Sequence, residues 1–373
     1  PLVLGAPAGD LAAWTGEARR AVGDFVLAYE RYFQRNAAGV AARTQLDPLP
    51  RVAAIPGFGL VGIGRGAAEA AIAADIAVSW AETLLAAEAV GRFAPLGEAD
   101  TIAMEYRSLE QAKLGKGAVR PLQGQGVAVT GGGGVIGAAT ARAFAAEGAQ
   151  VAVLDLDSGR ADKAARAAGA RALAVGCDVR DRSSVDAAFA AVVARFGGVD
   201  IVVSNAGAAV SGMIAELPDG DLRGSFELNL FAHQSVAKAA VRIMRAQRMG
   251  GAILFNVSKQ ALNPGANFGA YGVAKAALMA LMRQYALEHG GEGIRVNAIN
   301  PDRIRSGLLS EAMIAERSAA RGVDAVAYMA GNLLGEEVTG DDVAQAFVFA
   351  ARMRRTTGGV FTVDGGNVAA MVR

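Results

Sequence analysis

Hydrophobic and polar residues follow different patterns in the two parts of the chain. From about Gly124 onward, short runs of Val, Ile and Leu alternate with Ala-rich stretches of helical period. This alternation is typical of repeated β-α units. It predicts an α/β fold with a doubly wound, parallel, seven-stranded sheet covered by helices on both faces. The predicted strands are 126–130, 151–155, 171–175, 199–204, 252–258, 295–300 and 360–364.

The first 120 residues show few strands. The pattern predicts a helix over 10–35, a short apolar run over 51–55 and a long helix over 67–90. The long stretch carries four carboxylates, too many for a membrane span, so we expect a buried helix of a soluble protein. The change of pattern predicts a mainly helical N-terminal region, 1–120, and a second domain, 121–373.

Composition and charge exclude several classes of protein. The 373 residues are 53% hydrophobic, and 37 Lys and Arg balance 36 Asp and Glu with no basic block, so we expect neither a nucleic-acid nor a membrane partner. A single cysteine, Cys177, and a start without a signal-peptide layout predict a cytoplasmic protein. With only His233 and His289, no His-rich metal site is expected, and we interpret both residues as structural.

The chain contains 48 glycines, and several of them form a loop that is suited to binding a phosphate group. The loop lies between an apolar strand and an Ala-rich helix, where glycines let a pyrophosphate approach the backbone and the helix start favours an anion. Asp155 ends the next strand, 18 positions after Gly137, and there it would bind the adenosine ribose and repel a 2′-phosphate. The pattern therefore favours NAD over NADP. The predicted loop residues are Gly131, Gly133, Gly134, Val135, Ile136 and Gly137.

A second stretch, from Gly57 to Gly62, also matches G-x-G-x-x-G. Eighteen residues beyond it lies Trp80, inside a helical pattern, with no second strand and no acid to hold a ribose. We interpret this stretch as a tight packing turn.

Tyr271 and Lys275 are four residues apart at the start of an apolar helix and so lie on one face. A tyrosine that exchanges protons near neutral pH needs a nearby cation to favour the phenolate. Ser258 follows a strand thirteen residues earlier, and Asn229 falls in the preceding long helix. Taken singly, each of these residues also has an ordinary structural explanation.

Together, these motifs resemble the short-chain dehydrogenase/reductase family over about 250 residues. The match also includes Thr130, Asn300 and Asp364-Gly365-Gly366. The resemblance implies a Rossmann sheet and hydride transfer between nicotinamide and a carbonyl or alcohol. It implies that Tyr271 exchanges the proton, Lys275 binds the nicotinamide ribose, Ser258 positions the substrate oxygen and Asn229 supports a water relay. The further cofactor contacts it implies are Leu156, Asp178, Val179, Asn205, Ala206, Gly207 and Pro301.

Three positions depart from the family pattern. Val135 stands where glycine is usual and would crowd the pyrophosphate unless the neighbouring glycines let the loop shift. Asp302 replaces a glycine after the proline, and Lys259 replaces a small hydroxyl residue after Ser258. The segment from 302 to about 340 could form a substrate lid in which Arg303 or Arg305 meets an anion, or its arginines could be solvated.

The N-terminal region, from about Leu46, resembles the linking part of enzymes that fuse a class II sugar-phosphate aldolase, of the rhamnulose-phosphate type, to a short-chain dehydrogenase. No histidine precedes His233, so we expect the lyase part to be absent.

The leading hypothesis is an NAD-dependent oxidoreductase acting on a small alcohol, aldehyde or sugar-derived carbonyl, and the resemblance implies a homo-oligomer, dimer or tetramer. The alternatives are a fragment of an aldolase fusion and a nucleotide-binding regulator.

Overall fold

A computed structural model describes residues 1–7, 9–36, 43–112 and 119–367. The chain divides into two compact units, Pro1–Val119 and Arg120–Arg373. Each unit has its own sheet and its own buried residues.

The second unit is built on a seven-stranded sheet in which all neighbouring strands are parallel. The strand order, β10-β9-β8-β7-β4-β5-β6, confirms the predicted doubly wound Rossmann sheet. Most of the strand residues are fully buried, as helices on both faces require. The strands are β4 (Gly126–Thr130), β5 (Gln150–Asp155), β6 (Leu173–Gly176), β7 (Ile201–Ser204), β8 (Gly251–Asn256), β9 (Ile294–Pro301) and β10 (Val360–Val363).

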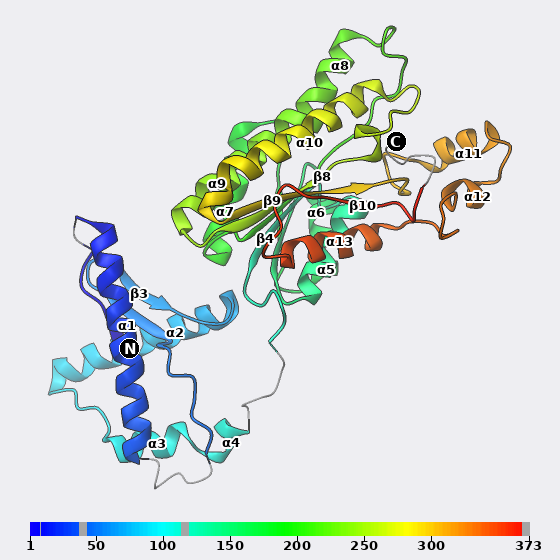
Figure 1. The fold of residues 1–373 in the computed structure, drawn as a ribbon. Coiled ribbons are helices and arrows are strands. Elements are labelled where there is room, and N and C mark those ends of the chain that lie inside the picture. The colour runs from blue at the N-terminus through cyan, green and yellow to red at the C-terminus, as the bar shows by residue number, and fades with distance from the viewer. Residues whose placement is uncertain (8, 37–42, 113–118, 368–373) are drawn as a thin grey trace. The chain divides into compact units, whose positions relative to one another are not determined.

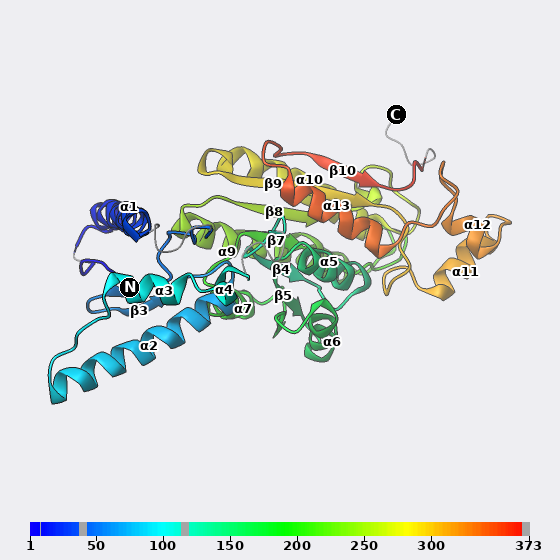
Figure 2. The same cartoon turned by 90° about the horizontal axis from the view of Figure 1, so that it is seen from below.

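Helices cover both faces of this sheet, as Figures 1 and 2 show for α10 and α13 on opposite sides. One face packs against α7, α9 and α10, and the other against α5, α6 and α13. The helices are α5 (Val135–Ala146), α6 (Ser158–Ala168), α7 (Arg182–Phe196), α8 (Asp219–Phe226), α9 (Ala232–Gln247), α10 (Gly269–His289), α11 (Glu311–Ala319), α12 (Ala325–Met329) and α13 (Gly340–Arg352).

The chain changes direction across the sheet between β4 and β7. Strands β4, β5 and β6 extend toward one edge, whereas β7, β8, β9 and β10 extend toward the other. The loops that follow β4 and β7 therefore diverge at the carboxyl ends of the strands and open a crevice there, the usual place for a ligand in such a sheet.

The first unit contains a small sheet, which the sequence did not predict, beside the predicted helices. Strands β2 (Val52–Ile55) and β3 (Gly59–Gly62) form an antiparallel hairpin, and β1 (Leu2–Val3) pairs with β2 in parallel. A small cluster around Tyr106 and Ile102 packs against aromatic residues of the first helix. The helices are α1 (Leu11–Asn36), α2 (Ala67–Val90), α3 (Glu98–Glu105) and α4 (Ser108–Gln111).

Helix α2 begins and ends where the sequence predicts, but the prediction that it is buried is wrong. Ala77 is its single buried residue, and several large apolar side chains on it are more than half exposed. An apolar composition favours burial of a helix, but whether the helix is buried depends on which elements pack against it. Among the described helices, α2 is the one that is long and apolar enough to cross a membrane, judged by length and composition alone.

The second glycine motif forms the turn and second strand of the β2–β3 hairpin, so no strand-to-helix phosphate loop exists there. Gly57 has a positive φ of 76° in the turn. A Cβ on Gly62 would lie 2.0 Å from the Ala70 carbonyl oxygen, so helix α2 passes directly against this strand. The structure agrees with the interpretation of the motif as a tight packing turn.

Candidate active site

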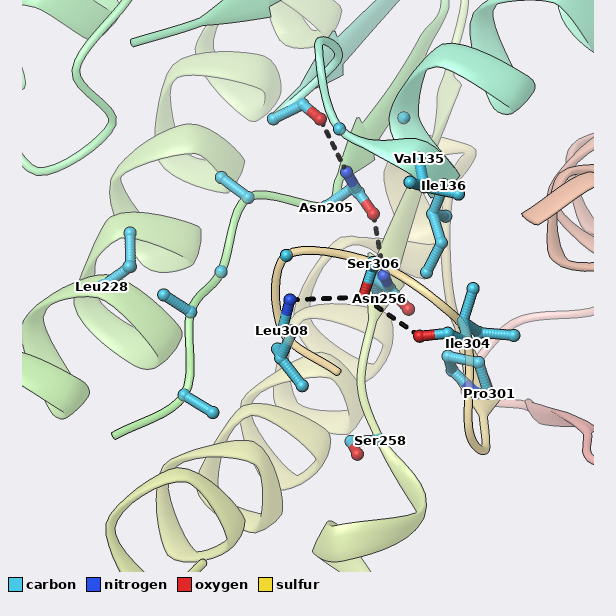
Figure 3. Close-up of a pocket in the computed structure, with 18 of the residues that line it drawn as sticks. Val135, Ile136, Asn205, Leu228, Asn256, Ser258, Pro301, Ile304, Ser306 and Leu308 are labelled. Atoms are coloured by element: carbon cyan, nitrogen blue, oxygen red, sulfur yellow. Dashed lines mark hydrogen bonds between the residues drawn. The ribbon is translucent and has the colours of Figure 1, made fainter. Parts of the chain in front are cut away.

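A cavity of about 630 Å³ opens at the carboxyl ends of β4, β7 and β8. The glycine loop after β4 forms one wall and the loop after β9 forms another (Figure 3). Every cofactor-binding residue predicted from the sequence lines this cavity, and so do Ser258, Tyr271 and Lys275. Asn229 is absent from the lining and lies behind it.

The glycine loop after β4 allows backbone contacts that larger residues would prevent. Gly131 has a positive φ of 60°, and a Cβ on Gly137 would lie 2.2 Å from the Gly131 carbonyl oxygen. Gly134 caps helix α5, whose first N–H groups have no carbonyl partner within the helix. A cradle of backbone N–H groups at a helix start fits a pyrophosphate.

Val135 occupies the first turn of α5, where the family pattern has glycine. Its side chain is 49% exposed and lines the cavity, and a Cβ built on Gly340 would lie 3.1 Å from its Cγ1. The valine is therefore accommodated beside the start of α13, where a residue larger than glycine at 340 would crowd it.

Carboxylates lie at the other end of the glycine loop. Asp155 is buried, and its two oxygens accept hydrogen bonds from the backbone N–H groups of Gly133 (2.9 Å) and Asp157 (3.1 Å). Arg160 also lines the cavity and donates to the Gly133 carbonyl at 3.4 Å. Asp178 forms an ion pair with Arg180 at 2.9 Å, so its carboxylate already has a cationic partner.

Asn205 ties together three neighbouring strands at the floor of the cavity. Its side-chain Nδ2 donates to the carbonyls of Thr130 (3.0 Å) and Gly131 (3.1 Å), and its Oδ1 accepts from Nδ2 of Asn256 at 2.7 Å (Figure 3). The amide therefore fixes the glycine loop against the ends of β7 and β8.

Ser258, Tyr271 and Lys275 meet on the side of the cavity formed by β8 and α10. Burial, partly offset by a hydrogen bond with Ser258, raises the pKa of Tyr271 to about 12. Burial lowers the pKa of Lys275 to about 7. The Lys275 Nζ lies 5.7 Å from the centre of the Tyr271 ring and donates to the Asn256 carbonyl at 2.9 Å.

The spacing of Tyr271 and Lys275 by one helical turn brings them together as expected, because residues i and i+4 share one face. Ser258 follows β8 and caps a short 3₁₀ turn, accepting from the Gln260 N–H at 3.3 Å. The hydroxyl is thereby held at the strand end, next to the helix that carries the phenol.

Asn229 lies in a π-helical turn, Glu227–Phe231, between α8 and α9. Such turns are rare and occur frequently at functional sites. Its Nδ2 donates to the carbonyls of Ala208 (2.8 Å) and Ser225 (3.0 Å), while its buried Oδ1 has no partner among the described residues. A Cβ on Gly207 would lie 3.0 Å from this oxygen and 3.6 Å from the Lys275 Nζ, so the missing side chain leaves room between the two atoms.

These geometric findings agree with the family models. A model described as enoyl-(acyl carrier protein) reductase matches residues 126–367. The chain belongs to the short-chain dehydrogenase/reductase family. It is an oxidoreductase of the kind that acts on alcohols and carbonyls.

Individual relatives give the same picture. The chain is 34% identical over 363 residues to the uncharacterized oxidoreductase YuxG of Bacillus subtilis. This match covers 94% of this chain and 52% of that protein. It is 34% identical over 245 residues to galactitol 2-dehydrogenase of Agrobacterium fabrum, covering 64% of this chain and 95% of that enzyme. The structure of 3-ketoacyl-(acyl-carrier-protein) reductase from Brucella melitensis, complexed with NADH, superposes with a TM-score of 0.60 at 27% identity, covering 65% and 98% of the two chains.

A second family model, the second domain of class II aldolases, matches residues 1–114. This corrects the expectation that the lyase part is absent: a class II aldolase domain is present in this dehydrogenase chain. The expectation rested on the absence of histidine from residues 1–114, and a domain can be present without that residue type. The chain spans about half the length of YuxG.

His233, which we interpreted as structural from the sequence, is buried and does not line the cavity, but its ring contacts Lys275, which does. It is 2% exposed, its Nδ1 lies 2.7 Å from the Ser204 Oγ and its Nε2 lies 3.4 Å from the Lys275 Nζ. Burial, followed by the nearby ammonium of Lys275, holds the pKa of His233 well below its usual value. No local pattern indicates this contact, because His233 and Lys275 are 42 positions apart in the sequence.

Lys259, one of the departures from the family pattern, is also at the cavity. It is 6% exposed and its Nζ forms an ion pair with Oδ2 of Asp364 at 2.7 Å. Asp364 follows the last strand, so this pair links the loop of Ser258 to the C-terminal edge of the sheet.

The two arginines considered for a substrate anion already have protein partners. Arg303 donates to the carbonyls of Tyr328 and Gly331. Arg305 forms ion pairs with Glu337 and Glu311. These interactions hold the segment after β9 together.

Proposed function

We propose that this chain is an NAD-dependent dehydrogenase that transfers a hydride between nicotinamide and a small alcohol, aldehyde or sugar-derived carbonyl. The observation that carries the proposal is the meeting of Ser258, Tyr271 and Lys275 in the same cavity as the glycine cradle. The name of the relative galactitol 2-dehydrogenase supports a polyhydroxylated substrate.

The protein's contribution to this reaction is to hold the substrate oxygen and to move its proton. The nicotinamide, when bound, supplies or accepts the hydride. Ser258 donates a hydrogen bond to the substrate oxygen, and the Tyr271 phenol exchanges a proton with it. Because burial disfavours the phenolate, the Lys275 ammonium is needed to offset that cost. Asn256 and His233 orient the ammonium.

Asn229 completes this arrangement from behind the cavity. Its unpartnered Oδ1 faces the space beside Gly207, next to the Lys275 Nζ. A buried carbonyl oxygen of this kind is normally satisfied by water. We assign it the role of holding a water that passes protons to and from Lys275.

The choice of NAD rests on Asp155. Its carboxylate is held at the end of β5 by two backbone N–H groups and lines the cavity, where it would accept from ribose hydroxyls and repel a 2′-phosphate. Arg160 is the cation on the same side that would favour NADP. The ratio of kcat/KM for NAD and NADP tests the assignment, and a preference for NADP would reverse it.

A Tyr271→Phe variant tests the proposed reaction. Turnover is measured by NADH absorbance over aldehydes, sugar alcohols and hydroxy acids, and NADH binding by fluorescence. We expect loss of turnover with NADH binding retained, because phenylalanine keeps the ring but has no proton to exchange. Tyr285→Phe is the matched control, since Tyr285 lies on the same helix and does not line the cavity. Retained turnover in Tyr271→Phe would overturn the role of the phenol.

A further inference from the structure

The substrate end of the cavity, by which we mean the part beside Ser258, Tyr271 and Phe268, has an unbalanced positive charge. Lys259 is neutralised by Asp364, and Arg303 lies 3.5 Å from the carboxylate of Asp302. Arg317 lines the same end of the cavity. Over residues 1–7, 9–36, 43–112 and 119–367, no carboxylate lies within ion-pair distance of its guanidinium.

Arg317 is held in place by an aromatic ring instead of an acid. It lies on α11, is partly buried, and its guanidinium carbon stands 4.5 Å from the centre of the Phe268 ring. Phe268 is buried and contacts the Tyr271 ring edge-on, with 6.5 Å between ring centres. One aromatic side chain thus separates the guanidinium from the phenol that we assign to proton exchange.

The surroundings of Arg317 favour a bound anion. Its guanidinium lies over the buried ring of Phe268, and Leu308 and Leu309 also line the cavity; apolar walls lower the local dielectric and strengthen charge interactions. A guanidinium is planar, and its fork of N–H donors matches the oxygens of a carboxylate or a phosphate.

We propose that Arg317 binds an anionic group of the substrate, a carboxylate or a phosphate, at a distance from the carbon that exchanges the hydride. The inference rests on the proposed function and narrows its substrate to an anionic hydroxy or carbonyl compound. It also gives α11, in the segment after β9, a role in substrate selection.

The test compares matched substrate pairs in NADH-linked reduction. Dihydroxyacetone phosphate against dihydroxyacetone represents a phosphate, and succinic semialdehyde against butanal represents a carboxylate. We expect the wild type to favour the anionic member of at least one pair. Arg317→Gln removes the charge together with the guanidinium that lies over Phe268, so kcat/KM for that anion should fall about 10- to 100-fold. The kcat/KM for its neutral counterpart should stay within about twofold.

Arg321→Gln is the matched control. Arg321 also stacks on a ring, that of Tyr328, but does not line the cavity, so its loss should leave both members of each pair unaffected. A wild type that reduces neutral and anionic members equally well would overturn the inference and leave the dehydrogenase proposal standing. An equal loss on both members in Arg317→Gln would assign the residue to packing and would also overturn it.

A binding measurement separates this inference from the proposed function. Thermal stabilisation by succinate and by inorganic phosphate is measured for the wild type and for Arg317→Gln. Stabilisation that depends on Arg317 supports the anion site, whether or not any substrate is turned over. A lack of turnover would count against the dehydrogenase proposal and not against the anion site. Equal stabilisation of the two proteins by both anions would overturn the anion site.

Discussion

The buried ion pair between Lys259 and Asp364 makes a sharp prediction for stability. Asp364→Asn keeps the shape of the side chain but leaves the Lys259 ammonium without its counter-charge, with only 8% of the lysine side chain exposed. Breaking a buried pair on one side costs about 3–5 kcal/mol of the free energy of unfolding. For a unit of about this size, that cost lowers Tm by roughly 6–20 °C.

The assay is thermal unfolding followed by far-UV circular dichroism and by tryptophan fluorescence. Both tryptophans, Trp14 and Trp80, lie in the N-terminal unit, so their emission serves as an internal control that should not change. The double variant Lys259→Met with Asp364→Leu should recover most of the loss, because an apolar pair needs no counter-charge. A cost below about 1 kcal/mol for Asp364→Asn, as for a surface pair, would refute the reasoning.

The same pair predicts a pH dependence. Burial raises the pKa of Asp364, but hydrogen bonds from Lys259 and from the Gly366 N–H outweigh burial and leave the pKa below its usual value. The stabilisation is therefore present above the pKa of an unfolded aspartate, about 3.9, and is lost as the pH falls through the lower folded value. Wild type and Asp364→Asn should accordingly converge in Tm under acid conditions, and a constant difference would contradict the assignment.

Three further predictions concern the cavity. Lys275→Met should abolish turnover yet raise Tm at pH 6, because burial lowers the pKa of Lys275 to about 7 and the charged form destabilises the fold below that pH. The gain in Tm should shrink as the pH rises from 7 toward about 10.4, the pKa of lysine in an unfolded chain. A gain in Tm that does not depend on pH would contradict this prediction. Gly137→Ala should cost about 1–3 kcal/mol and weaken NADH binding in a fluorescence titration, because its Cβ meets the Gly131 carbonyl; unchanged affinity would argue against the cradle. Asp155→Ser should narrow the preference for NAD over NADP in kcat/KM, and an unchanged ratio would remove Asp155 from cofactor selection.

Much of the fold could be predicted because its signals are local. The strands of the second unit are short apolar runs that helices bury on both faces, and the glycine loop, Asp155 and the Tyr271–Lys275 turn are separated by fixed spacings. The seven strands accordingly begin and end within a few residues of their predicted limits. The predicted cofactor residues lie around one cavity for the same reason.

The features that could not be predicted from the sequence depend on contacts between distant segments. His233 reaches Lys275 from a neighbouring helix, and Lys259 meets an aspartate 105 positions away. The apolar pattern of α2 gave its length but not its exposure, since burial depends on what packs against it. Arg303, Arg305 and Arg317 look alike in sequence, and only the placement of nearby carbonyls and carboxylates separates the first two from the third.

The link between Lys259 and Asp364 also bears on the order in which the site forms during synthesis. The glycine loop, Ser258, Tyr271 and Lys275 all precede β9, whereas Asp364 follows β10, the strand at the edge of the sheet. Because the chain is made from its N-terminus and domains fold as units, Lys259 has no counter-charge until β10 and Asp364 have been synthesised and the second unit can fold. Activity should therefore appear only after β10 has joined the edge of the sheet and Asp364 has paired with Lys259.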